Sequence, residues 1–262
     1  MKAKAIVLTG YGINCDIETA FAFNLAGADA RRVHINDVIA GIERLEDFQI
    51  MALPGGFSFG DDIASGKVFA NKLKHNLGEQ VELFIKDQKL VIGICNGFQA
   101  AVKFGLIPAI DGDYRRQTTT LTFNDSGRFE DRWVWLDMNK KSPCIWTKGI
   151  ERLYLPVRHG EGKFIPADNQ LLAELRAKEL VVAKYSTPDG AKAGYPWNPN
   201  GSVENIAAVC DPSGRVFGLM PHPEAHCDIT NHPRWTREPV PASIMGRQVF
   251  RNAVEWADAN LT

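Results

Sequence analysis

The sequence has 262 residues, of which 45% are hydrophobic and 23% are charged, so it can bury a sizeable core. Lys plus Arg number 30 against 31 for Asp plus Glu, and this balance gives no reason to expect nucleic acid or an anionic membrane as a partner. No apolar run approaches the roughly 20 residues of a membrane span, and the N-terminus leads directly into a strand pattern, so we expect a cytoplasmic protein.

The first part of the chain alternates strand and helix patterns. Residues 5–9 form the first predicted strand, and Asp16 is placed to cap the helix that follows. Further strands are expected near 30–35 and at 50–53. This alternation predicts one α/β domain over residues 1–262, with a mostly parallel sheet and helices on both faces. Ligands of such sheets bind at the carboxyl ends of the strands.

Residues 54–61, PGGFSFGD, form a glycine-rich loop before a long helix predicted over 68–86. Gly55 and Gly56 allow the backbone to turn its amides toward a ligand, although an ordinary turn has the same composition. Residues 60–67 have one residue too many for a phosphate-binding loop and lack the Ser or Thr that follows its Lys. We therefore expect no ATP site in this loop.

The strongest chemical signal lies in residues 90–104, LVIGICNGFQAAVKF. A short apolar strand ends at Cys95 and helical spacing begins at Asn96, so the thiol lies at a sharp strand-to-helix turn, with a glycine two residues away on each side. The start of the helix stabilises a thiolate and offers the backbone N–H of Asn96 to an oxyanion. A buried core cysteine between two packing glycines would show the same pattern.

Residues 118–138 are rich in β-branched and aromatic side chains and are divided by a turn at 124–127. This pattern predicts a small antiparallel hairpin inserted beside the main sheet. A further strand at 153–157 leads into the loop RHGEG at 158–162, where His159 is a rival candidate for a catalytic base.

The last predicted strand, at 216–220, ends in the sequence PHPE. Prolines on both sides of His222 fix the backbone and deny it a helix, which leaves His222 and Glu224 on the same side of an extended chain. A charged surface loop would look the same in isolation. Taken together with Cys95, the two residues complete a Cys–His–Glu triad of nucleophile, base and orienting carboxylate.

The other cysteines show no pattern of function. They lie at positions 15, 144, 210 and 227 and form no C-x-x-C pair. An odd, scattered set of this kind predicts free thiols rather than disulfides or structural zinc, and we expect no metal site. None of the four has the helix start or cationic neighbour that activates a thiol, so only Cys95 is expected to be reactive.

These motifs resemble those of the triad-type glutamine amidotransferases. PGGFSFGD, GICNGFQ and PHPE carry the general resemblance, which spans almost the whole chain. SGRFEDRW, RHGEG and NPNGS make the chain similar, within that family, to the glutaminase subunits of phosphoribosylformylglycinamidine synthases of de novo purine biosynthesis. The resemblance implies that Cys95 attacks the carboxamide of glutamine, that His222, oriented by Glu224, protonates the departing ammonia, and that water then hydrolyses a glutamyl thioester.

The resemblance also implies further site residues. It places the N–H of Gly56 in an oxyanion hole opposite that of Asn96, places His159 near the triad, and assigns the role of base to His222. Gln99 lies one helical turn from Cys95, so it is a candidate for positioning the glutamine substrate, although a polar residue on a helix face can equally be solvated.

The resemblance also implies partner subunits. The resemblance implies no cofactor here, with ATP and Mg²⁺ used by a larger synthetase subunit that receives the ammonia, and with a small accessory subunit in the assembly. Three alternatives remain open at this point. The chain could serve a different synthetase, act as a cysteine hydrolase or protease on a similar fold, or be a regulatory subunit that has lost catalysis.

Overall fold

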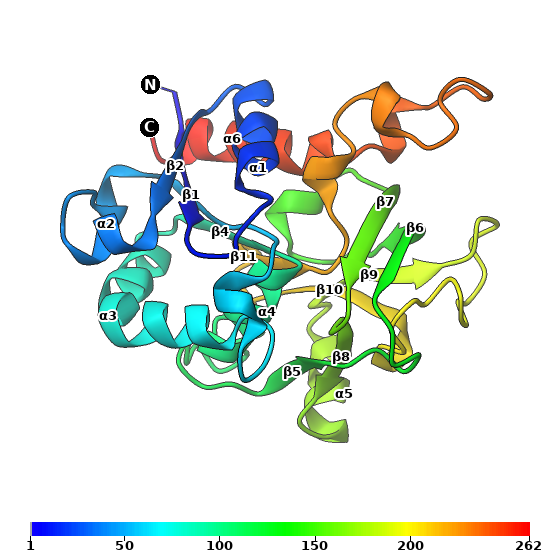
Figure 1. Ribbon diagram of the computed structural model, residues 1–262, viewed down its shortest axis with the longest axis horizontal. Helices are drawn as coiled ribbons and strands as arrows, with labels where there is room; N and C mark the ends of the chain where they lie inside the picture. The colour runs from blue at the N-terminus through cyan, green and yellow to red at the C-terminus, as the bar shows by residue number, and fades with distance from the viewer. Residues whose placement is uncertain (1) are drawn as a thin grey trace.

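The computed structural model describes residues 2–262, which form an α/β fold around one nine-stranded sheet (Figure 1). The order of strands across this sheet is β2-β1-β3-β4-β11-β10-β9-β6-β7, and β5 and β8 form a separate two-stranded sheet. The strands are β1 Lys4–Thr9, β2 Asp29–His34, β3 Ile50–Leu53, β4 Leu90–Ile94, β5 Thr119–Thr122, β6 Glu130–Met138, β7 Arg152–His159, β8 Lys163–Pro166, β9 Val181–Ser186, β10 Ile206–Cys210 and β11 Val216–Leu219. The α-helices are α1 Asp16–Leu25, α2 Ile35–Ile39, α3 Lys67–Lys86, α4 Asn96–Phe104, α5 Asn169–Ala177 and α6 Arg247–Asn260.

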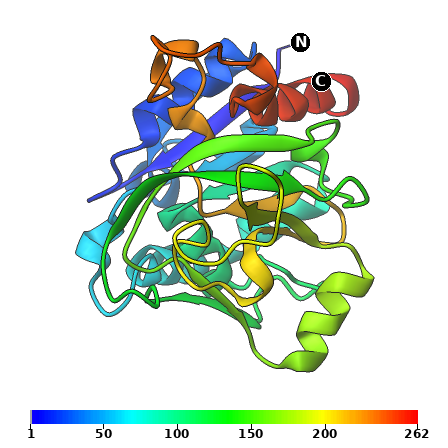
Figure 2. The same ribbon diagram turned by 90° about the vertical axis from the view of Figure 1, so that its right-hand side faces the viewer.

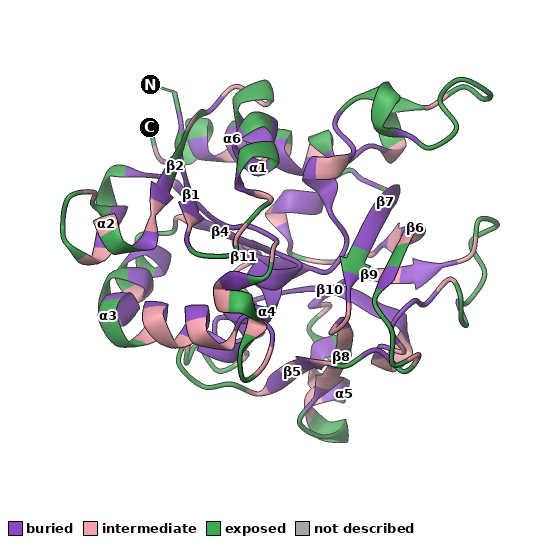
Figure 3. Cartoon of the chain, viewed as in Figure 1, coloured by how far each residue is buried: buried purple, intermediate pink, exposed green. Residues whose placement is uncertain are grey.

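One half of the sheet is parallel and covered on both faces. Strands β2, β1, β3, β4 and β11 run parallel to their neighbours. Helices α1 and α6 pack together on one face, and α3 and α4 pack together on the other (Figure 1). Every residue of β3, β4 and β11 is buried (Figure 3), as expected for parallel strands between two helical layers. The predicted α/β fold with helices on both faces is confirmed.

The other half of the sheet is antiparallel. Strand β10 pairs with β11 and β9, and β6 pairs with β9 and β7. Figure 2 shows β6 and β7 as a long curved ribbon across the molecule. Among residues 2–262, no helix is both long enough and apolar enough to cross a membrane.

The small antiparallel element predicted from residues 118–138 is present, but the predicted hairpin pairing is wrong. Strand β5 pairs with β8 instead of with β6. The turn itself exists, because the N–H of Gly127 donates to the carbonyl of Asn124 at 2.9 Å. The side chain of Asn124 is buried and bonds to the backbone of His159 and Gly162, at the loop between β7 and β8. Local composition identified the turn, whereas the choice of strand partner depends on segments far along the chain.

The predicted cap of the first helix is also wrong. Cys15, not Asp16, is the N-cap residue of α1. The carboxylate of Asp16 is 3.0 Å from a guanidinium nitrogen of Arg32 on β2, so this side chain ties the helix to the neighbouring strand.

Helix α4 lies so close to the sheet that only glycine fits at the contact. A Cβ atom at Gly97 would overlap the carbonyl oxygen of Leu53 on β3. A Cβ at Gly93 would lie 2.7 Å from the carbonyl oxygen of Gly97. These glycines therefore set the distance between β4 and the start of α4, which is the turn that carries Cys95.

We predict that Gly97→Ala lowers the free energy of unfolding by about 1–3 kcal/mol or more, because the added methyl group must displace backbone. Gly194→Ala is the matched control, since no heavy atom lies within 4 Å of the added carbon. This control should change stability by less than about 0.5 kcal/mol. Urea unfolding of both variants provides the measurement, and equal stabilities would contradict the close approach of α4.

Candidate active site

Four loops that follow neighbouring strands meet at one edge of the sheet. They follow β1, β3, β4 and β11, which lie side by side in that order. The loops carry, in the same order, Cys15, Gly56, Cys95 and His222. The loops with Gly56, Cys95 and His222 each follow a strand predicted from the sequence, and they meet here because carboxyl ends of parallel strands lie at the same edge of a sheet.

Cys95 lies in a strained turn and is almost fully buried. Its backbone has φ 49° and ψ −106°, in a region that non-glycine residues rarely adopt. The N–H of Cys95 donates to the carbonyl of Leu219 at 2.8 Å, so the turn is bonded to the end of β11. Its Sγ lies 3.6 Å from the carbonyl oxygen of Arg158. The strand-to-helix turn predicted at Cys95 is therefore present.

His222 and Glu224 form a buried pair directly after β11. Nδ1 of His222 is 2.6 Å from Oε1 of Glu224, and the N–H of His222 donates to the carbonyl of Pro156 at 2.9 Å. Burial opposes protonation of His222, but the Glu224 carboxylate together with Cys95 and Cys15 outweighs it and raises the pKa of His222 well above its usual range. A histidine held in this way is suited to keep a neighbouring sulfur as thiolate.

The backbone between His222 and Glu224 differs from the extended chain that the prolines led us to expect. Residues Pro223–Ala225 form a single 3₁₀ turn, and the N–H of Ala225 donates to the carbonyl of His222 at 3.3 Å. Pro223 takes the N1 position of this turn, which its fixed φ suits. The turn brings the carboxylate back to the imidazole.

The glycine-rich loop presents a free backbone N–H beside the site. The loops after β1 and β3 form a short bridge, in which the N–H of Phe57 donates to the carbonyl of Gly12 at 2.8 Å. Gly56 has φ 145°, and a Cβ there would lie 2.8 Å from three backbone atoms of the facing loop. Within residues 2–262, neither the N–H of Gly56 nor that of Asn96 donates a hydrogen bond. Both donors are thus available to a ligand.

The side chain of Asn96 connects the glycine-rich loop to α4. Its Oδ1 accepts from the N–H of Ser58 at 3.1 Å, and its Nδ2 donates to Asp61 at 2.8 Å and to Oε1 of Gln99 at 3.0 Å. Gln99 is buried, and its Nε2 donates to the carbonyl of Glu161. The side chain of Gln99 therefore joins the start of α4 to the loop at 158–162, and its predicted contact with glutamine stays a prediction.

His159 is held by two side-chain amides. Its Nδ1 is 3.2 Å from Oδ1 of Asn124, and its Nε2 is 3.5 Å from Nδ2 of Asn200. Oδ1 of Asn124 also accepts from the N–H of Gly162 at 2.9 Å. Burial, with a smaller repulsion from His222, lowers the pKa of His159 to about 3. His159 is therefore neutral at physiological pH and fixes the loop at 158–162, which supports His222 rather than His159 as the base.

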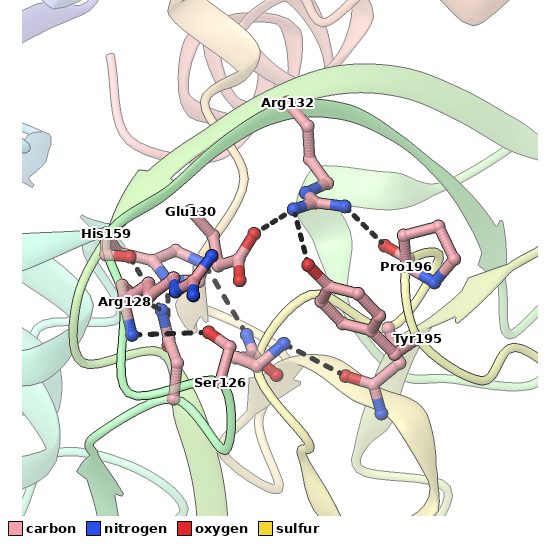
Figure 4. A network of polar contacts seen from close by, with 10 residues as sticks. Ser126, Arg128, Glu130, Arg132, His159, Tyr195 and Pro196 are labelled. Atoms are coloured by element: carbon pink, nitrogen blue, oxygen red, sulfur yellow. Dashed lines mark hydrogen bonds and ion pairs between the residues drawn. The ribbon is translucent and has the colours of Figure 1, made fainter.

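An ion pair on β6 lies opposite the end of β7, the strand that leads into this loop. Arg132 on β6 pairs with the buried carboxylate of Glu130, which lies opposite His159 in the β6–β7 register. Arg132 also donates to the hydroxyl of Tyr195 at 3.2 Å (Figure 4). The contact between Arg132 and Tyr195 joins segments far apart in sequence, so the motifs gave no signal of it.

One residue of the site was missed by the sequence analysis. Cys15 was expected to lack a reactive context, yet it lies at the start of α1. Its Sγ, a ring nitrogen of His222 and a carboxylate oxygen of Glu224 all lie within 4.8 Å of one another. The sequence did hold one signal for Cys15. This residue lies in the loop after the first parallel strand, and that loop reaches the same sheet edge as the other motifs.

Comparisons with known proteins give matches that cover nearly the whole chain. The family profile of the CobB/CobQ-like glutamine amidotransferase domain matches residues 2–257. The phosphoribosylformylglycinamidine synthase subunit PurQ of Dehalococcoides mccartyi is 48% identical, and the match covers 98% of this chain and 98% of the relative. That of Methanococcus maripaludis is 43% identical, with 98% and 99% covered. A chain in the structure of PurLQS from Thermotoga maritima matches with a TM-score of 0.72 and 29% identity, covering 98% of this chain and 99% of that one.

The buried, neutral His159 predicts a specific pH dependence of stability. Its pKa is about 3 in the folded state and near 6.5 when unfolded, so between these values the unfolded state binds more protons. Stability attributable to His159 is therefore complete above pH 6.5 and is lost as pH falls toward 3, by about 1.4 kcal/mol per pH unit. His159→Gln should remove this contribution, which lowers the free energy of unfolding by about 2 kcal/mol between pH 6.5 and 5.

Urea unfolding of the wild type and of His159→Gln at pH 5, 6 and 7.5 measures the effect. Comparing slopes rather than absolute values cancels any loss of stability that the substitution itself causes. Parallel slopes for the two proteins would show that His159 is not buried in its neutral form.

Proposed function

This chain belongs to the CobB/CobQ-like glutamine amidotransferase domain family, and we propose that it is the glutaminase subunit of phosphoribosylformylglycinamidine synthase in purine biosynthesis. The single observation that carries the chemistry is the placement of Cys95 beside the buried His222–Glu224 pair, at the ends of the adjacent strands β4 and β11. Relatives named as this subunit share 43–48% identity with the chain over nearly its full length, which favours this acceptor enzyme over other synthetases and over a free-standing hydrolase.

The proposed reaction converts glutamine and water to glutamate and ammonia. The Cys95 thiolate attacks the side-chain carboxamide carbon, and the N–H groups of Gly56 and Asn96 stabilise the oxyanion that forms. Protonated His222 gives its proton to the nitrogen as the C–N bond breaks, leaving a glutamyl thioester on Cys95 and releasing ammonia. Neutral His222 then takes a proton from water, which attacks the thioester and regenerates the thiolate.

Glu224 acts through His222 in this scheme. Its Oε1, 2.6 Å from Nδ1, fixes the ring so that Nε2 faces the reacting atoms, and it stabilises the imidazolium formed during each cycle. The strained backbone of Cys95 keeps its sulfur at the start of α4, where the helix dipole also favours a thiolate.

The partners of the reaction are proposed from the same relatives. We infer that a larger synthetase subunit receives the ammonia, since the relatives are themselves subunits and a chain of PurLQS has this fold. A small accessory subunit and the use of ATP and Mg²⁺ by the synthetase are further parts of the proposal. The cytoplasmic location expected from the sequence stays a prediction.

The proposal predicts that Cys95→Ser abolishes glutamine-dependent synthesis by the assembled enzyme while synthesis from added ammonia persists. This separation is expected because glutamine hydrolysis and acceptor activation occupy different subunits. Product formation is measured with each nitrogen donor in turn. Cys144→Ser, at a buried thiol outside the four loops of the site, is the control and should retain both activities. Loss of both activities in Cys95→Ser would contradict the assignment of glutamine hydrolysis and acceptor activation to different subunits.

A further inference from the structure

Cys15 places a second thiol against the catalytic histidine. A Cβ built on Gly55 would lie 2.7 Å from Cε1 of His222 and 3.3 Å from Sγ of Cys15, so both side chains pack on this glycine. The thiol of Cys15 makes a long contact of 3.4 Å to Oδ1 of Asn14. It has no part in the proposed hydrolysis, which uses Cys95 as the nucleophile.

The neighbouring His222–Glu224 pair has polar atoms that make no hydrogen bond within the part of the chain that the structure describes. His222 and Glu224 are only 2% and 4% exposed. Nevertheless, Nε2 of His222 and Oε2 of Glu224 have no hydrogen-bond partner among residues 2–262. Buried polar atoms rarely lack a hydrogen-bond partner. Catalysis accounts for Nε2, but the mechanism gives no use to Oε2 of Glu224.

Cys15, His222 and Glu224 carry the three types of ligand atom that zinc prefers. A thiolate, an imidazole nitrogen and a carboxylate oxygen bind Zn²⁺ at about 2.0–2.3 Å, whereas Mg²⁺ and Ca²⁺ prefer oxygen alone. The three candidate atoms lie within 4.8 Å of one another, so a modest contraction would bring them around one ion. A Cys15 thiolate and the Glu224 carboxylate together carry two negative charges, which a divalent cation would neutralise.

An entry path reaches this group from solvent. Cys15 and Glu224 line a groove of about 390 Å³ together with Arg158 and Cys227. Cys15 itself is only partly buried. An ion could therefore reach Cys15 and Glu224 from the groove, where a water molecule could complete a four-coordinate site with the buried His222.

We propose that Cys15, His222 and Glu224 form a binding site for a soft divalent cation, Zn²⁺ or Cd²⁺, and that occupancy of this site inhibits the chain. On binding, the Cys15 thiol and the imidazolium of His222 each release one proton to solvent, and the sulfur, the freed ring nitrogen and the Glu224 carboxylate bond to the metal. The ion ties up the imidazole and the carboxylate, so His222 can no longer protonate the departing ammonia. The inhibition part rests on the proposed function, whereas the binding part does not.

Metal binding is tested on the purified full-length chain without any assay of activity. Cd²⁺ is titrated while the sulfur-to-cadmium charge-transfer absorption is recorded, and Zn²⁺ affinity is measured by competition with a chromophoric chelator. The compared proteins are the wild type, Cys15→Ser and Cys95→Ser. Serine is a favoured N-cap residue, so Cys15→Ser should fold, and its thermal unfolding midpoint provides the check.

The expected result is that Cys15→Ser binds Zn²⁺ at least about tenfold more weakly and loses the charge-transfer band, as loss of a direct ligand requires. Cys95→Ser should keep the band and bind Zn²⁺ within about threefold of the wild type. If Cys95→Ser loses the band while Cys15→Ser keeps it, the ion is held by the catalytic thiol and the proposal is wrong. Absence of any band in the wild type would also overturn it.

Inhibition is measured separately as glutamate release by the assembled enzyme over a range of Zn²⁺ concentrations. Cys15→Ser should need at least about tenfold more Zn²⁺ for half-inhibition than the wild type. Equal sensitivity of the two proteins would overturn the inhibitory role. A wild type that releases no glutamate in the absence of metal would count against the proposed function, and the titrations would still decide the binding site.

Discussion

The site depends on one close contact between backbones, at the start of α4. Gly97 lies directly against the carbonyl of Leu53, and Gly93 lies against Gly97 itself, so any side chain there would push the helix away from the sheet. Because the helix begins so near to β4, the chain must reverse within a single residue, and Cys95 takes the strained conformation that results. The same approach leaves the N–H of Asn96 without a partner inside residues 2–262, beside the sulfur.

Buried amides then hold the loops around this turn. Asn96 joins the glycine-rich loop to α4, and Asn124 and Asn200 hold His159. Such side chains donate and accept at once, so a single residue can satisfy the backbone of two loops in directions that an apolar contact could not specify. The geometry of the candidate site is thus fixed by polar contacts around an apolar core, and His159 contributes in its neutral form.

The sequence contained enough to predict the fold class and the three loops at the sheet edge. Apolar strands, flanking glycines and the prolines around His222 are local features, and the rule for parallel sheets brings the strand ends together. The pairing of β5 with β8, the brace formed by Gln99 and the position of Cys15 beside His222 were not predicted. Each depends on contacts between segments far apart in the chain, which spacing within a motif does not encode.

The central claim is that the turn at Cys95 makes this thiol, and no other, the nucleophile. The most direct measurement is the rate at which an electrophilic glutamine analogue labels each of the five cysteines, determined by mass spectrometry of the digested chain with and without competing glutamine. The account predicts rapid labelling of Cys95 that glutamine suppresses, with the other thiols labelled far more slowly. Labelling of Cys15 or Cys227 at a rate comparable to that of Cys95 would contradict it.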